Sequence, residues 1–153
     1  MKEADLREEV DINLEQMQVV VDELVKLQNE VSGRDPTLVE KVAAGAFLMQ
    51  FYTGAENVLK RISKHNGIPL PDGERWHAEL LRRFCLPPRA GLPGLFDGEL
   101  AKEFEEFRSF RHIVRSGYGT DLNWALMARG IDRVPAAFEQ FRTAVLNYLN
   151  TLE

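Results

Sequence analysis

The sequence predicts an all-α protein built as an antiparallel bundle of four or five helices. Apolar residues recur at steps of three and four along most of the 153 residues, and no segment sustains the alternation typical of a strand. Gly, Pro and capping residues separate these periodic segments. Amphipathic helices bury their apolar stripes against one another, so a bundle forming a single domain over residues 1–153 is expected.

The two N-terminal helices are predicted to be the longest. The first covers residues 6–31 and ends at Gly33, and its apolar stripe is Leu6, Val10, Leu14, Met17, Val21, Leu24, Leu27 and Val31. The second covers residues 36–65, with Asp35 as its cap and proline at its first position. Its wide apolar face, which we expect at the centre of the core, holds Leu38, Val42, Phe47, Met49, Phe51, Tyr52, Val58, Leu59 and Ile62.

A short helix and a longer one are predicted in the middle of the chain. Asp72 is expected to cap the short helix, whose inward face is Trp76, Leu80, Leu81 and Phe84. Pro and Gly residues between positions 87 and 94 then exclude regular structure. A fourth helix starts at Asp97, and its seam is Leu100, Phe104, Phe107, Arg111 and Val114.

The C-terminal part is predicted to form two further helices. Thr120 or Asp121 is expected to cap a short helix that ends at Gly130, since glycine commonly terminates helices. The last helix follows, with one stripe made of Val134, Phe138, Phe141, Val145, Tyr148 and Leu152.

The charge balance argues against a protein that coats DNA. The chain has 19 Lys and Arg against 24 Asp and Glu, a net charge of −5. The first fifteen residues hold six of the acids and only two bases, so the rest is nearly neutral. Residues 107–120 contain three arginines and no acid, which makes a local basic surface compatible with RNA.

Cysteine and histidine usage points away from disulfides and metal sites. Cys85 is the single cysteine and is expected to be structural. Glu74 and His77 have the spacing of a di-iron ligand pair, but the sequence has no second Glu-x-x-His, so no metal is expected and His77 is predicted to be a packing residue. The sequence has no run of 18 apolar residues and no signal-peptide pattern, so we expect a cytoplasmic protein.

Arg111 breaks the packing pattern of the fourth helix. It occupies a seam position between Phe107 and Val114, where a lone buried guanidinium is costly. Either its side chain extends past the seam to solvent, or the seam opens onto a cleft at this point.

The segment Arg111-His112-Ile113-Val114-Arg115-Ser116-Gly117-Tyr118 resembles the catalytic motif of the HEPN superfamily of helical ribonucleases. It is most similar to the HepT-like toxins, whose partners are minimal nucleotidyltransferases. Their motif is Arg, four residues, His, one residue and Tyr. Arg111 and Tyr118 match it, and Ser116 occupies the histidine position. Residues 51–62 and the Trp76-His77 pair are similar to the same group.

The resemblance implies a HEPN-like bundle that cleaves RNA without a metal or other cofactor. It also implies a homodimer in which two motifs face one cleft, and a nucleotidyltransferase antitoxin as partner. In such a site Arg111 clamps the scissile phosphate, and Arg108 and Arg115 add positive charge. Glu56 or Asn57 is expected to orient Arg111 from the second helix.

Ser116 leaves the proton-transfer step open, since losing general acid–base catalysis typically costs ~10²–10⁴ in rate. The protein could be a noncatalytic module that still binds RNA or the nucleotidyltransferase, or the serine could be a substitution made so that a toxic protein can be produced. His112 could also replace the missing imidazole, although it lies about 100° around the helix from Arg111. A helical adaptor with no RNA site is a more distant alternative.

Tyr118 has a separate expected role by resemblance. In the toxin family the tyrosine after the motif histidine is the residue that the partner modifies with AMP. A bulky anionic group there would block the cleft and repel phosphate. The alternative interpretation is an aromatic side chain packed where the helix ends.

Overall fold

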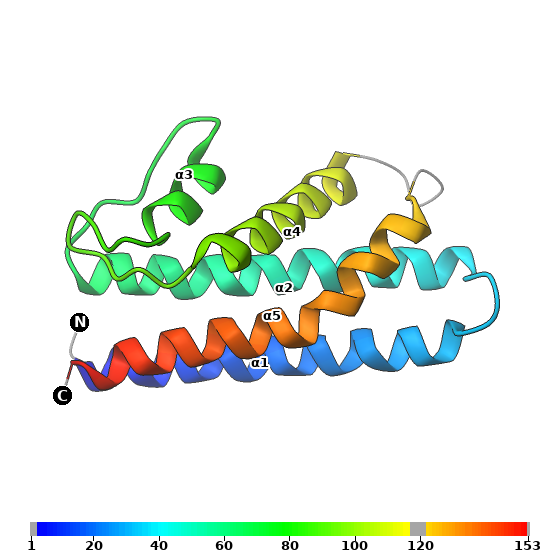
Figure 1. The fold of residues 1–153 in the computed structure, drawn as a ribbon, viewed down its shortest axis with the longest axis horizontal. Coiled ribbons are helices and arrows are strands. Elements are labelled where there is room, and N and C mark those ends of the chain that lie inside the picture. Colours follow the sequence, from blue (N-terminus) through cyan, green and yellow to red (C-terminus); the bar gives the residue numbers. More distant parts are fainter. Residues whose placement is uncertain (1–2, 117–121, 153) are drawn as a thin grey trace.

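The computed structural model describes residues 3–116 and 122–152, and of residues 115 and 116 the backbone alone. Five helices make up this part of the chain (Figure 1): α1 (Glu3–Val31), α2 (Leu38–His65), α3 (Trp76–Arg83), α4 (Gly98–Ser116) and α5 (Trp124–Asn150). The described residues form no β-strand, so the predicted all-α class is confirmed. None of the described helices is long and apolar enough to cross a membrane.

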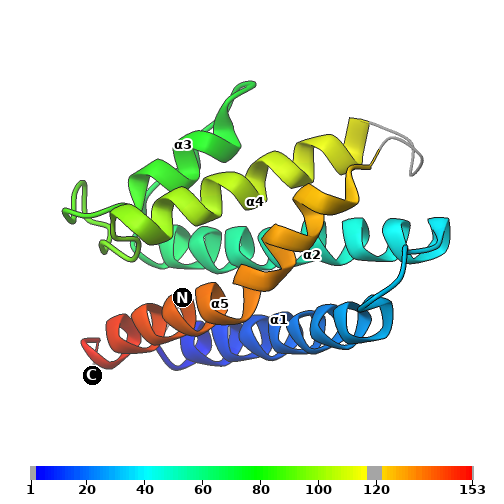
Figure 2. The same cartoon turned by 45° about the vertical axis from the view of Figure 1, so that its right-hand side comes forward.

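The helices pack in an antiparallel arrangement around α2. Helix α1 runs alongside α2 in the opposite direction, and the C-terminal half of α5 lies beside α1 (Figure 1). Helix α4 lies across the other side of α2, and the short α3 stands over the C-terminal half of α2 beside α4 (Figure 2). Both ends of the described chain therefore lie at the same end of the bundle.

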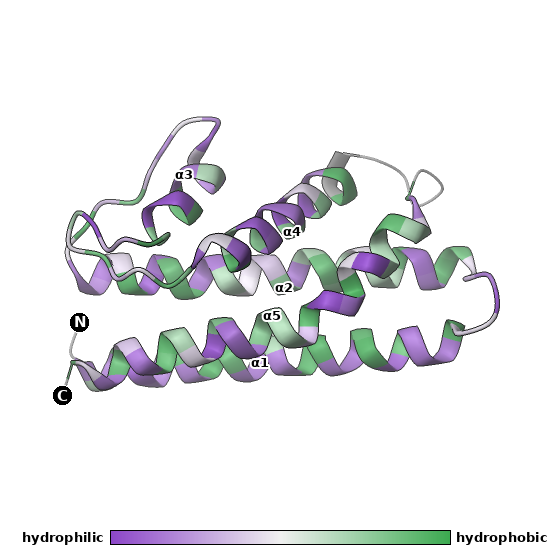
Figure 3. Ribbon diagram, viewed as in Figure 1, coloured by the Kyte–Doolittle hydropathy of each residue, from purple (hydrophilic) through white to green (hydrophobic). Residues whose placement is uncertain are grey.

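The α1 stripe predicted from periodicity is buried at all eight positions. Hydrophobic and hydrophilic residues are interspersed along the whole helix (Figure 3). On α2 the expectation is wrong for Leu38 and Val42, which are exposed. At 100° per residue these two side chains point well away from the stripe of Ala44 and Leu48. The core-facing side of α2 is therefore narrower at its N-terminal end than the sequence predicted.

Two of the predicted N-terminal capping residues are wrong. Helix α2 is capped by Thr37, not Asp35, because Thr37 and Glu40 form a capping box. The Oγ1 of Thr37 accepts from the Glu40 amide at 3.1 Å, and the Glu40 carboxylate accepts from the Thr37 amide at 2.9 Å. Helix α3 follows Arg75 with no side-chain cap, so Asp72 does not cap it. Asp97, where the fourth helix was predicted to start, lies just before α4 and accepts from the Leu100 amide at 2.8 Å.

The two predicted C-terminal helices are one continuous helix, α5, and Gly130 does not end it. Gly130 lies against the ring of Phe110 on α4, so the glycine serves close packing of two helices. Pro135 also lies inside α5 and removes one backbone donor, and the helix changes direction near its middle (Figure 1). The Asn123 side chain caps α5; the predicted caps at positions 120 and 121 lie outside the described residues.

Candidate active site: a basic cleft between α3 and α4

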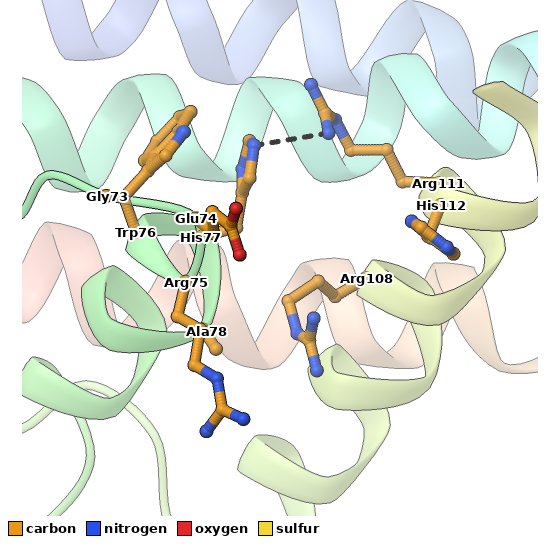
Figure 4. Close-up of a pocket in the computed structure, with 9 residues that line it drawn as sticks. All are labelled: Gly73, Glu74, Arg75, Trp76, His77, Ala78, Arg108, Arg111 and His112. Carbon is orange, nitrogen blue, oxygen red and sulfur yellow. Dashed lines mark hydrogen bonds between the residues drawn. The ribbon is translucent and has the colours of Figure 1, made fainter. Parts of the chain in front are cut away.

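A cleft of about 470 Å³ lies between α4 and the start of α3. The loop before α3 supplies one wall and the exposed face of α4 the other (Figure 4). The residues that line it are Gly73, Glu74, Arg75, Trp76, His77, Ala78, Arg108, Arg111 and His112.

The cleft is rich in basic side chains. Three arginines and two histidines line it, against the single carboxylate of Glu74. Arg108 is paired with Glu105 at 2.7 Å, whereas Arg75 is exposed at the rim and makes no ion pair with a described residue. The surface therefore attracts anions, although the protein as a whole is acidic.

Arg111 is half-buried and reaches from α4 across to α2. Its Nε donates to Thr53 Oγ1 at 3.4 Å, and its Nη1 faces His77 Nε2 at 3.4 Å (Figure 4). No carboxylate in the described chain lies within ion-pairing distance of this guanidinium. The seam therefore opens onto a cleft at Arg111, and the guanidinium keeps its charge available for an anion.

His77 is held by a buried carboxylate. Its Nδ1 lies 2.6 Å from Glu56 Oε2, and Glu56 is only 2% exposed. The imidazole also contacts the ring of Trp76, with ring centroids 3.5 Å apart and ring planes tilted by 31°. Because a carboxylate accepts, Nδ1 carries the proton, and in the neutral imidazole Nε2 is then the acceptor that faces Arg111. His77 is thus more than the packing residue that the sequence predicted.

Helical spacing explains how these side chains gather. Thr53 and Glu56 are three residues apart on α2, so both point to the same side, toward α3 and α4. Arg108, Arg111 and His112 occupy positions i, i+3 and i+4 of α4, which also form one face. This spacing places His112 in the cleft although it lies a quarter-turn from Arg111.

The orienting partner of Arg111 differs from the expected one. Thr53 contacts the guanidinium directly, whereas Glu56 lies behind His77 and acts on the imidazole. Asn57 lines hollows on the side of α2 that faces α1, together with Asn13 and Met17, so it is not in the cleft. The expectation that Asn57 orients Arg111 is therefore wrong.

Three expected site residues cannot be placed in the cleft. The side chains of Arg115 and Ser116 at the end of α4, and the whole of Tyr118, lie outside the described residues. Their roles stay predictions from the motif.

A buried tyrosine lies beneath the cleft on α2. The hydroxyl of Tyr52 is buried and has no hydrogen-bond partner among the described residues. Burial raises the pKa of Tyr52, and the negative charge of Glu56 raises it further. The phenol is therefore protonated near neutral pH.

The described residues show no cluster of three metal-binding side chains. Glu74 and His77 both line the cleft, but the Nδ1 of His77 is occupied by Glu56. Nor does Cys85 belong to the site: its thiol donates to the carbonyl of Leu81 at 3.5 Å, and burial raises the pKa of Cys85.

These features define a class of protein, an all-α bundle whose basic cleft pairs a guanidinium with a carboxylate-bound imidazole. Residues 43–152 match the model of the family described as HepT-like protein, and the chain belongs to this family. The match confirms the family predicted from the motif and includes every described residue that lines the cleft. No curated protein and no solved structure matches the chain.

Proposed function

We propose that this HepT-like protein is the ribonuclease toxin of a toxin–antitoxin system, and that it cleaves RNA at the α3–α4 cleft without a metal ion. The observation that carries the proposal is Arg111. Its guanidinium lies in a basic cleft without a carboxylate partner and beside an imidazole nitrogen. A phosphate group satisfies such a guanidinium through two parallel hydrogen bonds.

The cleft offers more positive charge than one phosphate requires. Arg75 and Arg108 lie on opposite walls, so a single-stranded RNA that passes between them meets a positive charge on each side. Trp76 lies in the same cleft and carries Lys60 4.6 Å above its ring. Basic residues interleaved with an aromatic ring suit a single-stranded nucleic acid.

The experiment is cleavage of a single-stranded RNA, labelled at one end, by the purified protein in excess EDTA. We expect cleavage that Arg111→Ala abolishes and Arg111→Lys restores only weakly, because lysine lacks the bidentate geometry. Arg142→Ala is the matched control, since this arginine lies on α5 and pairs weakly with Glu139 at 3.9 Å. Equal cleavage by wild type and Arg111→Ala would exclude the site.

A noncatalytic module that binds RNA or a nucleotidyltransferase is the second candidate, and Ser116 favours it. A serine hydroxyl at the motif histidine position is a poor general acid or base near neutral pH without a partner. For this candidate, wild type binds RNA with an Arg111-dependent affinity but leaves the RNA intact. Cleavage or growth arrest that appears only in Ser116→His would then identify the missing imidazole as the sole defect.

The proposed partners come from the family. We propose a homodimer and a nucleotidyltransferase antitoxin that transfers AMP to Tyr118. Sedimentation of the purified protein tests the dimer. Incubation with a nucleotidyltransferase encoded beside this gene and ATP, followed by mass spectrometry, tests the transfer, which Tyr118→Phe should abolish.

A further inference from the structure

We infer that His77 of α3, positioned by Glu56 of α2, is the proton-transfer group of this cleft and takes the place of the absent motif histidine. The inference rests on the proposed ribonuclease function. It assigns the base to a different helix from the one that carries the motif.

The first argument is the environment of Glu56. Its side chain is 3% exposed, and a buried carboxylate is costly unless it is paired and hydrogen-bonded. The carboxylate pairs with His77 Nδ1, at 2.6 Å. A carboxylate in this position holds one tautomer of the imidazole and stabilises the imidazolium that forms when Nε2 accepts a proton. Orienting a histidine is therefore a role that the Glu56 geometry fits.

The second argument is the direction of Nε2. This nitrogen faces the cleft and lies 3.4 Å from Arg111 Nη1, a long contact that a bound anion would easily displace. An imidazole acceptor and a guanidinium this close can engage the same nucleotide, one at the ribose 2′-hydroxyl and the other at the adjacent phosphate.

The third argument is rigidity. The imidazole is fixed on one edge by Glu56 and on one face by Trp76, whose centroid is 3.5 Å away. Its side chain is only 18% exposed. His112 lines the same cleft but is exposed on the surface of α4. His77 therefore has the restrained geometry that a general base requires.

Cleavage of RNA by attack of its own 2′-hydroxyl needs only His77, Arg111 and water. Nε2 of His77 accepts the proton of the 2′-hydroxyl, and the bond between the 2′-oxygen and phosphorus forms while Arg111 stabilises the charge on the phosphate. The bond from phosphorus to the 5′-oxygen breaks, and that oxygen takes a proton from solvent. The products are a 2′,3′-cyclic phosphate and a 5′-hydroxyl, and the imidazolium then returns its proton to water.

The test is single-turnover cleavage of RNA in EDTA across about pH 5 to 8, the range in which histidines titrate. We expect His77→Gln to lower the rate by ~10²–10⁴ and to remove the fall in rate at acid pH. RNA affinity, measured separately by fluorescence anisotropy, should be unchanged. Glu56→Gln should lower the rate less. His65→Gln, a change at the far end of α2, should match wild type.

A second readout does not depend on turnover. Long-range ¹H–¹⁵N NMR of the folded protein reports which imidazole nitrogen carries the proton. We expect the Nδ1–H tautomer at His77 and a shift toward the other tautomer in Glu56→Gln. Circular dichroism and thermal unfolding show whether each variant is folded.

The outcomes separate the inference from the proposed function. Wild-type cleavage that His77→Gln leaves unchanged, or an acid limb that His112→Gln removes instead, overturns the role of His77 and leaves the ribonuclease assignment intact. Cleavage that appears only in Ser116→His also overturns the role of His77. Absence of cleavage in wild type and in Ser116→His overturns both.

Discussion

Gly130 of α5 and Phe110 of α4 lie so close together that no side chain fits between them. A Cβ at position 130 would lie 2.7 Å from Cε2 of the Phe110 ring. This contact explains why a residue that usually ends helices is retained inside α5. It also sets how closely α5 approaches the helix that carries Arg111.

We predict that Gly130→Ala lowers the free energy of unfolding by about 1–3 kcal/mol, because the added methyl group overpacks the helix crossing. This loss outweighs the better helix propensity of alanine. In a Phe110→Ala background the clash is gone, so the same change should stabilise by up to about 1 kcal/mol. Chemical denaturation of the four proteins measures both effects, and an equal loss in both backgrounds would contradict the packing argument.

Arg61 links α2 to α1 through two contacts that should contribute unequally to the stability of the fold. Its Nε donates to Oδ1 of the buried Asn13 at 2.7 Å, and its Nη1 pairs with the half-exposed Glu9 at 2.6 Å. Arg61→Met should cost about 1–3 kcal/mol, because it leaves a buried amide oxygen without a donor. Glu9→Gln should cost less than about 1 kcal/mol. Urea denaturation compares them, and a larger effect of Glu9→Gln would refute this ranking.

Tyr52 carries a hydroxyl that contributes no hydrogen bond to a described residue. Tyr52→Phe should therefore raise the free energy of unfolding by about 1 kcal/mol, since an unpaired polar group leaves the interior. Tyr148→Phe is the matched control, because the Tyr148 hydroxyl bonds to Asn66. That variant should lose about 1 kcal/mol. Destabilisation by Tyr52→Phe in thermal unfolding would show that its hydroxyl does have a stabilising role.

Glu40 makes the start of α2 sensitive to acid. The Arg34 side chain and the Thr37 amide hold the pKa of Glu40 at about 2, below its usual 4.5. A lowered pKa stabilises the fold above about pH 4.5, and this contribution is lost as the pH falls toward 2. Glu40→Gln keeps the capping box but removes the charge. The difference in denaturation midpoint between wild type and Glu40→Gln should therefore shrink over this range, and a constant difference would contradict the assignment.

The helices were predictable where periodicity and burial coincide. The α1 stripe from Leu6 to Val31 is one example, since each of its positions is buried and α1 packs against both α2 and α5. The continuity of α5 was not predictable, because Gly130 and Pro135 are local signals for a break. Tertiary contacts on both sides of them decide the outcome, and no local pattern records those contacts.

The candidate site was predictable only in part. Arg111 was found because a charge interrupts an apolar seam, which a single helix reveals. His77 was missed because its partners are 21 and 34 residues away and meet it only when α3 packs against α2 and α4. The signal that was present is the helical spacing of Thr53 and Glu56, which places a hydroxyl and a carboxylate on one side of α2.

The folded bundle is larger than the region that matches the family, because it includes the buried apolar stripe of α1. The matched residues, 43–152, contain every described cleft residue but none of α1. Yet α1 contributes eight of the buried apolar side chains and covers α2 along its length. A chain trimmed to the matched residues would keep the residues that line the cleft but would expose a long apolar groove, and exposed apolar surface of this kind favours aggregation.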